Sequence, residues 1–341
     1  MRVRIRTILL AAVLIFTLAA VTACAQTQQA GETGAGEPSG TITLYTSVPQ
    51  PIADKIQADF NQRFPNITLE IFRAGTSEVV TKISTEKEAG AIQADLVWVA
   101  EPSTYEDFKA EDLLLQFTPE GADALSAEMK DPDGYYYAGR LINMIIGYNT
   151  GVEPVPAGWQ AMLSDSYEHG KVGFPSPLRS GAAEAAVRAL VDQFGWEYFE
   201  NFQANGGIQV QNNSAARDQL ATGELQVSAL LDYIVRDAMA DGSPIDYVFP
   251  EEGTVMIPSP VAIFKASDNP QAAQVFVEFV ISQEGQQTLV ELGNFYPVRS
   301  DVDPPEGAPP LSEIKQMPVD WKNVREMRQE TKDRWTAIFG E

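Results

Sequence analysis

The sequence predicts an α/β protein made of two lobes with a ligand cleft between them. The chain has 341 residues, which corresponds to two domains at roughly 100–200 residues each. From residue 41 onward, segments that alternate like β-strands take turns with segments of helical periodicity, an order typical of parallel sheets covered by helices. Hydrophobic residues make up 44% and charged residues 21% of the chain, which is the composition of a folded rather than a disordered protein.

Net charge excludes one class of partner. The chain has 24 basic and 47 acidic residues, which gives a formal net charge of −23. A nucleic-acid-binding protein needs a basic surface to meet the phosphate backbone. We therefore expect no nucleic-acid partner.

The segment at 2–21 differs in composition from the rest of the chain and has the features of an export signal. Arg2, Arg4 and Arg6 precede an uncharged apolar run at 8–21. This run is shorter than the about 20 residues that a membrane-spanning helix needs. A basic start followed by a short apolar run is typical of a secretory signal.

The end of this run predicts a lipid anchor. It closes with Val21-Thr22-Ala23-Cys24, which resembles the lipobox of bacterial lipoproteins. Cys24 is the only cysteine, so we expect cleavage before it, lipidation of its thiol and no disulfide. Residues 1–23 are expected to be a lipoprotein signal peptide, and residues 24–40, which lack apolar periodicity, a flexible tether.

Strands and helices alternate in a first unit of the fold. Apolar residues four apart predict a helix that begins near Pro51 and stops at Pro65. Flanking segments alternate apolar and polar residues or are continuously apolar, as strands do. The expected elements are a strand at 41–45, that helix, a strand at 67–71, a helix after the turn at 74–77, and a strand at 96–100.

A second unit of the same kind is expected at 143–250. Ser214 is expected to cap a helix that Gly223 ends, because serine accepts from free N–H groups and glycine adopts the left-handed conformation. The other elements expected here are strands at 171–174, 208–211, 226–231 and 245–249 and a helix at 180–194.

The last part of the chain is expected to return to the first unit. An apolar segment at 255–264 leads to a helix that begins at Asn269-Pro270. Apolar residues at helical spacing between Trp321 and Ile338 predict one amphipathic C-terminal helix. The expected domains are lobe 1 at 41–142 plus 251–300, and lobe 2 at 143–250 plus 301–341, which includes that helix.

Residues for enzyme chemistry are scarce. His169, in a polar segment, is the only histidine, and the only cysteine lies in the signal. The chain has no GxSxG, P-loop or HExxH motif. We therefore expect that this protein is not an enzyme. The 47 acidic residues leave one alternative open, a lipid-anchored hydrolase that uses a pair of carboxylates.

Several stretches, taken in order, resemble one family of transport proteins. They are Leu44-Tyr45-Thr46-Ser47, Gly75-Thr76-Ser77-Glu78, Ala94-Asp95-Leu96-Val97-Trp98, Ile146-Gly147-Tyr148-Asn149-Thr150, Asn212-Asn213-Ser214, Val248-Phe249-Pro250-Glu251-Glu252-Gly253 and Ile257-Pro258-Ser259-Pro260. The chain from about 41 to 340 is similar to the family-1 extracellular solute-binding proteins of ABC importers. Its closest branch is the ferric-ion-binding protein group.

This resemblance implies a fold and a role. The fold is the two-lobed type II periplasmic-binding-protein fold with a central ligand cleft. The role is to capture a small ligand on the extracytoplasmic face of a bacterial membrane and to deliver it to an ABC permease and its ATPase, as a monomer, without catalysis and without a resident cofactor. A ligand-sensing subunit of a signalling system shares this fold and stays an alternative.

The resemblance also suggests iron(III) as one transported ligand. Ferric binders of this family use a His after the first strand, a Glu after the strand at 96–100, and a Tyr-Tyr pair after the strand at 226–231. Glu101 and Tyr233 match two of these positions, whereas Pro49 and Ile234 stand at the others. Iron(III) prefers anionic oxygen ligands, so Glu101 and Tyr233, even with Asp232, would need a synergistic anion to complete the metal shell.

Predicted helix starts suggest an anionic ligand instead. Thr76-Ser77 and Ser180-Gly181 place hydroxyls and free backbone N–H groups where the helix dipole favours negative charge. Asn213 and Arg236 could donate further hydrogen bonds, Arg236 in a bidentate manner. A phosphorylated or phosphonate compound would suit these donors, and the sequence leaves the choice between it and iron(III) open. The candidate ligand-binding residues are Thr46, Ser47, Thr76, Ser77, Glu101, Ser176, Ser180, Gly181, Asn213, Asp232, Tyr233 and Arg236.

Overall fold

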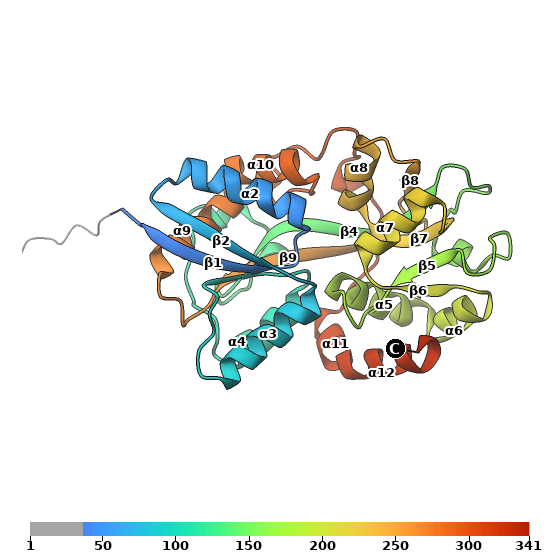
Figure 1. Cartoon of the computed structure of the whole chain (residues 1–341), viewed down its shortest axis with the longest axis horizontal. Coiled ribbons are helices and arrows are strands. Elements are labelled where there is room, and N and C mark those ends of the chain that lie inside the picture. Colours follow the sequence, from blue (N-terminus) through green and yellow to red (C-terminus); the bar gives the residue numbers. More distant parts are fainter. Residues whose placement is uncertain (1–36, 341) are drawn as a thin grey trace, which may run out of the picture. The chain divides into compact units, whose positions relative to one another are not determined.

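The computed structural model describes residues 37–340 (Figure 1). The expected signal peptide at 1–23, the lipidation of Cys24 and most of the expected tether at 24–40 lie outside the described residues. From Pro38 onward the chain forms one compact unit. No helix between residues 37 and 340 has the length and apolar character needed to span a membrane.

One mixed sheet of nine strands organises the fold. The strand order is β2-β1-β3-β9-β4-β7-β5-β6, and β8 pairs with β4 outside this path. The strands are β1 Gly40–Thr46, β2 Ile67–Arg73, β3 Leu96–Trp98, β4 Tyr137–Asn149, β5 Val172–Pro175, β6 Ile208–Val210, β7 Val227–Leu231, β8 Ile245–Val248 and β9 Val255–Ile263. We call β2, β1 and β3 the first half of the sheet, and β7, β5 and β6 the second half.

Helices cover both halves. The α-helices are α2 Gln50–Arg63, α3 Thr76–Glu88, α4 Pro102–Ala110, α5 Gly181–Phe194, α6 Glu197–Ala204, α7 Asn213–Thr222, α8 Asp232–Ala240, α9 Pro270–Ile281, α10 Gln283–Gly293, α11 Trp321–Glu326 and α12 Arg328–Phe339. Four 3₁₀ turns lie at Ala122–Ala124, Ala127–Met129, Trp159–Leu163 and Leu311–Glu313. The expected alternation of strand and helix is confirmed in both units.

Strand register in the first half brings three strand ends together. β1 is parallel to β2 and to β3, and Thr46 pairs with Arg73 on one side and with Trp98 on the other. The residues after these strands therefore meet at one edge of the sheet. In the second half, β5 is likewise parallel to β6 and β7.

Two long strands connect the halves. β9 is antiparallel to β3 and to β4, and β4 is antiparallel to β7 (Figure 1). The sequence analysis predicts β9 but no strand over Tyr137–Asn149. The residues of β4 are buried on both faces over most of its length, so they show none of the alternation that reveals a strand with one exposed face.

One predicted helix boundary is wrong. Asn212, in extended backbone, is the N-cap of α7, and its side chain accepts a hydrogen bond of 3.0 Å from the Ala215 N–H. Ser214 therefore lies inside the first turn and does not cap it. Gly223 ends α7 in the left-handed conformation, as expected.

The expected single C-terminal helix is two helices. α11 and α12 meet at Met327, whose backbone leaves the helical range (φ −96°, ψ 6°). α12 is anchored by Trp335, which is fully buried and lies 5.8 Å from the Phe174 ring and 5.2 Å from the Phe199 ring. This ring cluster fixes α12 to the second half of the sheet. The residue limits of the two lobes stay a prediction.

Candidate functional site

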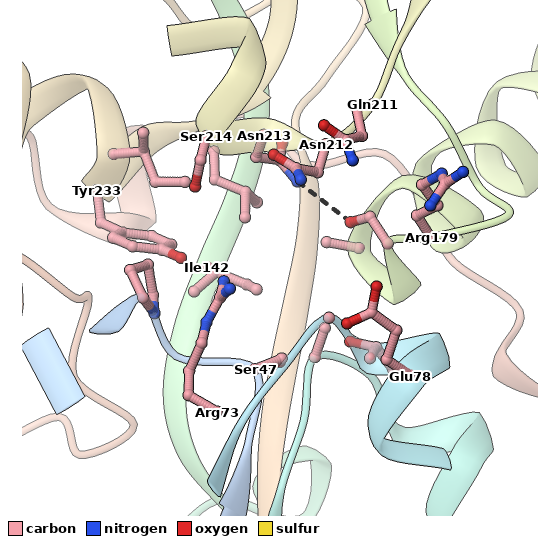
Figure 2. A pocket seen from close by; sticks show the side chains of 18 of the residues that line it. Ser47, Arg73, Glu78, Ile142, Arg179, Gln211, Asn212, Asn213, Ser214 and Tyr233 are labelled. Atoms are coloured by element: carbon pink, nitrogen blue, oxygen red, sulfur yellow. Dashed lines mark hydrogen bonds between the residues drawn. The ribbon is translucent and has the colours of Figure 1, made fainter. Parts of the chain in front are cut away.

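A cavity of about 130 Å³ lies where the two halves of the sheet face each other (Figure 2). One wall comes from the carboxyl ends of β1 and β2 and the start of α3. The opposite wall comes from the starts of α5 and α7, and β4 and α8 close the cavity between them. Such a position between two α/β halves is typical of ligand sites.

The first wall carries a helix start with free donors. α3 begins at Thr76, and its N-cap Gly75 has no side chain that could accept from the first N–H groups. Thr76 and Ser47 line the cavity beside it. Uncapped N–H groups and the positive end of the helix dipole favour an anion here.

The opposite wall carries two more helix starts. Ser180 is the N-cap of α5, and its hydroxyl accepts from the Ala183 N–H at 3.3 Å. The same hydroxyl accepts from Asn213 Nδ2 at 3.1 Å, which joins α5 to α7 (dashed line in Figure 2). Asn213 and Ser214, in the first turn of α7, also line the cavity. Three helix N-termini therefore converge on one small space.

A buried cation faces this space from β4. Arg140 lines the cavity and is 1% exposed. Its Nε donates to Ser259 Oγ at 3.2 Å, and its guanidinium lies over the Phe295 ring at 4.5 Å. Within residues 37–340 it forms no ion pair, and its Nη1 has no hydrogen-bond partner. Burial lowers the pKa of Arg140, because a low-dielectric surrounding disfavours an unpaired charge.

Two further arginines line the cavity from the two walls. Arg73 ends β2, and its Nε donates to the Val48 carbonyl at 3.2 Å. Arg179 precedes the cap of α5 and pairs with no acid among the residues that the structure describes. Glu78 is the one acidic residue among the described residues that line the cavity. The lining thus has an excess of positive charge in a strongly acidic protein.

An aromatic hydroxyl completes the lining. Tyr233 is buried, packs edge-on against Phe295 and lies beneath the guanidinium of Arg140. Figure 2 shows Tyr233 and Arg73 pointing toward each other across the cavity. Burial raises the pKa of Tyr233 more strongly than Arg140 lowers it, so the hydroxyl keeps its proton at neutral pH and can donate it in a hydrogen bond.

The structure brings five of the candidate residues to the cavity. They are Ser47, Thr76, Ser180, Asn213 and Tyr233. The remaining seven do not line it: Thr46, Ser77, Glu101, Ser176, Gly181, Asp232 and Arg236.

Glu101 stabilises the start of α4 and does not line the cavity. It is the N-cap of α4, where its carboxylate accepts from the Ser103 N–H at 2.7 Å and from the hydroxyls of Ser103 and Thr104. Gly181 packs against Glu101 and Thr76. A Cβ atom on Gly181 would lie 3.0 Å from Thr76 Cγ2 and 3.2 Å from Glu101 Cγ, so only glycine lets α5 approach α3 this closely.

Asp232 and Arg236 pair with each other instead of with a ligand. Their side chains meet at 2.9 Å, and both are buried. Asp232 also accepts from the backbone N–H and the side-chain Nδ2 of Asn143, each at 3.0 Å. Arg236 donates to the Asn294 carbonyl at 2.7 Å. These bonds tie α8 to β4 and to the end of α10.

The other three residues also serve the backbone or the surface. Thr46 Oγ1 donates to the Trp98 carbonyl at 2.7 Å and accepts from the Val48 N–H, while Ser176 Oγ accepts from the Leu178 N–H. Ser77 lies on the outer side of α3, in a surface groove beside α12.

Protein ligands for a metal are few here. No group of three or more His, Cys, Asp and Glu that could hold a metal ion occurs within residues 37–340. Glu101 is turned into α4, so it does not join Tyr233 in the cavity. The arrangement of positive charge, helix starts and neutral hydroxyls is suited to an anion.

The three arginines of the cavity are not among the ligand-binding residues predicted from the sequence. Arg73 and Arg179 each stand just before a predicted helix start, at 74–77 and at Ser180, and this position was the available signal. Arg140 is the one charged residue of β4, which is buried over most of its length. Because that strand was not predicted, the burial of this charge was not visible.

Comparison with known proteins identifies the family. Residues 55–318 match the sequence model of a family described as bacterial extracellular solute-binding proteins. The chain belongs to this family. Its members bind solutes outside the cytoplasm for ABC importers, carry no cofactor and carry their ligands as transported substrates.

Relatives and solved structures agree with this assignment. A putative 2-aminoethylphosphonate-binding periplasmic protein of Salmonella typhi is 23% identical over 303 residues, which are 83% of this chain and 87% of the relative. The periplasmic binding protein AfuA from Actinobacillus pleuropneumoniae, with fructose-6-phosphate bound, superposes with a TM-score of 0.79 at 20% identity, over 88% of this chain and 99% of AfuA. Iron-bound HitA from Pseudomonas aeruginosa superposes with a TM-score of 0.75 at 21% identity, over 87% of this chain and 99% of HitA.

At such identities the structural likeness shows the fold alone. The expected two-lobed periplasmic-binding-protein fold is confirmed. This solute-binding protein is therefore of the ABC-importer type, and its relatives are binding proteins rather than enzymes.

Proposed function

We propose that this solute-binding protein captures a small phosphonate or phosphate monoester between its lobes and delivers it to an ABC permease and its ATPase. The observation that carries the proposal is Arg140, a buried cation that lines the cavity without a counter-ion among the described residues. Burying an unpaired charge costs several kcal/mol, and an ionic partner with good geometry and hydrogen bonds offsets this cost. A ligand anion is the partner that this position lacks.

The rest of the lining favours an anion of high charge density. Arg73 and Arg179 approach from opposite walls, and arginine suits phosphoryl groups because its planar fork donates two parallel hydrogen bonds. The helix starts at Thr76, Ser180 and Asn213 add backbone donors and their dipoles. A doubly charged phosphonate or phosphate would use all of these groups.

Cavity size limits the ligand. A protein cavity of about 150 Å³ accepts benzene, which has six heavy atoms, and this cavity measures about 130 Å³. A compact ligand of roughly six heavy atoms therefore fills this space, which suits one phosphoryl or phosphonyl group with a short substituent.

Names of relatives support the same chemistry. The Salmonella relative is named for 2-aminoethylphosphonate, and AfuA was solved with a sugar phosphate. A protein named phosphoglycerate transport regulatory protein PgtC, from Salmonella typhimurium, is 25% identical over 206 residues, which are 54% of this chain and 51% of PgtC. A shared preference for phosphorylated or phosphonate solutes is consistent with the arginines of the cavity.

An iron(III)–anion complex finds less support as the ligand, although HitA was solved with iron bound. It would need Tyr233 as tyrosinate, and burial raises the pKa of that hydroxyl. Its carboxylate ligand would be Glu101, which is engaged at the start of α4. A carboxylate-pair hydrolase finds little support as well, because Glu78 is the lone acid among the described lining residues.

The proposal includes the location. Lipidation of Cys24 would tether the binding unit to the outer face of a bacterial membrane through residues 24–40, and we propose that it works there as a monomer.

Isothermal titration of the metal-stripped protein tests the ligand. We expect 2-aminoethylphosphonate or inorganic phosphate to bind with a stoichiometry of one without metal, and Ser180→Ala to weaken binding about ten-fold. Ser282→Ala is the matched control, since Ser282 caps α10 far from the cavity by accepting from the Gly285 N–H. Each loses an N-cap that is worth about 1 kcal/mol of stability, but only the first should lose affinity. Heat released only with iron(III) and citrate, and none with the phosphorus compounds, would refute the proposal.

A further inference from the structure

Behind the ligand cavity, one arginine of the C-terminal helix reaches both halves of the molecule. Arg328 begins α12. Its Nε donates to Glu184 Oε1 on α5 at 2.8 Å, and its Nη2 donates to Ser103 Oγ on α4 at 2.7 Å. Its Nη1 pairs with Asp107, also on α4. α4 follows β3 in the first half, whereas α5 follows β5 in the second.

α12 itself belongs to the second half. It packs on α5 and α6, and Trp335 holds it there by its rings and by a 3.0 Å hydrogen bond from Nε1 to Gln209 Oε1. The contacts of Arg328 with Ser103 and Asp107 are therefore contacts between the halves. Arg325 on α11 adds a second one, an ion pair of 2.6 Å with Asp107.

Arg328 also neutralises acids that face each other from the two halves. Glu101 of α4 and Glu184 of α5 are 1% and 6% exposed, and Nη2 of Arg328 lies 3.7 Å from Glu101. Asp107 is the third carboxylate at this point. Burial, and to a smaller extent the charge of Glu101, raise the pKa of Glu184 to about 7. Without a cation between them, like charges from two halves push the halves apart.

This cluster lies directly behind both cavity walls. Glu101 is the N-cap of α4 and, with Thr76 of the first wall, is the nearest neighbour of Gly181 at the start of α5. Glu184 lies in the first turn of that same helix. A change in the distance between α4 and α5 therefore changes the distance between the Thr76 wall and the Ser180 wall.

We infer that Arg328 is a positioning residue for solute binding: it clasps α4 to α5 and so holds the two walls of the cavity at binding distance, in the absence of solute as well as in its presence. This role concerns the lobe equilibrium and is independent of which solute the cavity takes. Apparent affinity scales with the populated fraction of the binding-competent form, so the clasp also sets affinity without touching the ligand.

Distances between spin labels in the solute-free protein test the inference. The labels go on Glu88→Cys and Glu224→Cys, two exposed positions of the first and second halves, in a full chain that carries Cys24→Ser. Arg328→Gln should shift the distribution to longer distances and lower the ratio of short to long distances about ten-fold, since the group is one-quarter exposed and its ion pairs are partly screened. Arg328→Lys, which keeps the charge but loses the fork, should lie between Arg328→Gln and the wild type.

Arg334→Gln is the matched control. Arg334 is on the same helix but pairs with Glu200 of α6, at 3.2 Å, within the second half. It should leave the distribution unchanged. Circular dichroism establishes that each variant is folded. If Arg328→Gln is not, Asp107→Asn removes the ion pair on the α4 side of the clasp and should give a shift in the same direction. A folded Arg328→Gln variant, or an Asp107→Asn variant in its place, with the wild-type distribution would overturn the inference. Because no solute is present, this result is independent of the ligand proposal.

Discussion

Replacing Arg140 with methionine should separate stability from function. Arg140 is 1% exposed, forms no ion pair within residues 37–340, and donates a hydrogen bond from Nε to Ser259 Oγ while its Nη1 has no partner. Methionine has a similar unbranched stem, is apolar and adapts to irregular space. Exchanging poorly compensated buried charges for apolar side chains is often neutral or stabilising by about 1–4 kcal/mol. We therefore expect the free energy of unfolding of solute-free Arg140→Met to be unchanged or to rise by about 1–2 kcal/mol.

Binding should change in the opposite direction. Truncating one partner of a buried charge pair costs about 2–5 kcal/mol, which is roughly a 30-fold to several thousand-fold loss of affinity. Urea unfolding of the solute-free protein measures the first effect, and titration calorimetry with 2-aminoethylphosphonate measures the second. At saturating solute, the wild type should gain stability by mass action and Arg140→Met should not.

Arg299 provides the control for this experiment. Its side chain is 10% exposed, but it is paired with Asp301 at 2.7 Å and lies outside the cavity. Arg299→Met should lower the free energy of unfolding and leave affinity unchanged. The reasoning fails if Arg140→Met loses more than about 2 kcal/mol of stability while it binds the solute like the wild type, because Arg140 would then be a structural residue.

Two further predictions rest on the same geometry, and a third rests on the sequence alone. Gly181→Val should lower the affinity for the phosphonate at least ten-fold in calorimetry, because a Cβ at this position lies 3.0 Å from Thr76; unchanged binding would show that the walls do not meet here. Burial and Glu101 raise the pKa of Glu184 from 4.5 to about 7 against the opposing charges of Arg328 and Lys332, so the folded chain binds an extra proton between these pH values. Its free energy of unfolding should therefore fall as the pH rises from about 4.5 to 7. In urea unfolding, Glu184→Gln should lack a part of this fall that amounts to about 3 kcal/mol. An identical pH dependence in both proteins would contradict the shift. Cys24→Ser should release the protein from bacterial membranes into the soluble fraction and abolish incorporation of a labelled fatty acid, and retention of the label by the variant would refute lipidation at Cys24.

Much of the fold could be predicted because its elements are short and amphipathic. The helix at Gln50–Arg63 lies between prolines and repeats its apolar residues every four positions, and both features were visible in the sequence. β4 could not be predicted, because this strand lies in the middle of the sheet and has no exposed polar face that would alternate with a buried one. The cap of α7 was misplaced by two residues because Asn212 and Ser214 are both good caps, and only the backbone conformation chooses between them.

The candidate site was predicted in part for a similar reason. A hydroxyl at a helix start can be recognised from the few residues around it. Thr76 and Ser180 were therefore predicted, and both line the cavity. Asp232 and Arg236 stand four residues apart on one helix and form an ion pair with each other. Because they are paired, neither side chain is free to bind a ligand. The arginines depend on which strand ends meet across the cleft, and this is a property of the tertiary structure rather than of any one segment.

A crystal structure of the protein with 2-aminoethylphosphonate tests the central claim most directly. We predict that the phosphorus atom lies between the guanidinium of Arg140 and the hydroxyl of Ser180, with its oxygens within hydrogen-bond distance of both side chains. A phosphonate bound elsewhere, or a cavity that holds iron coordinated by Tyr233 instead, would contradict it.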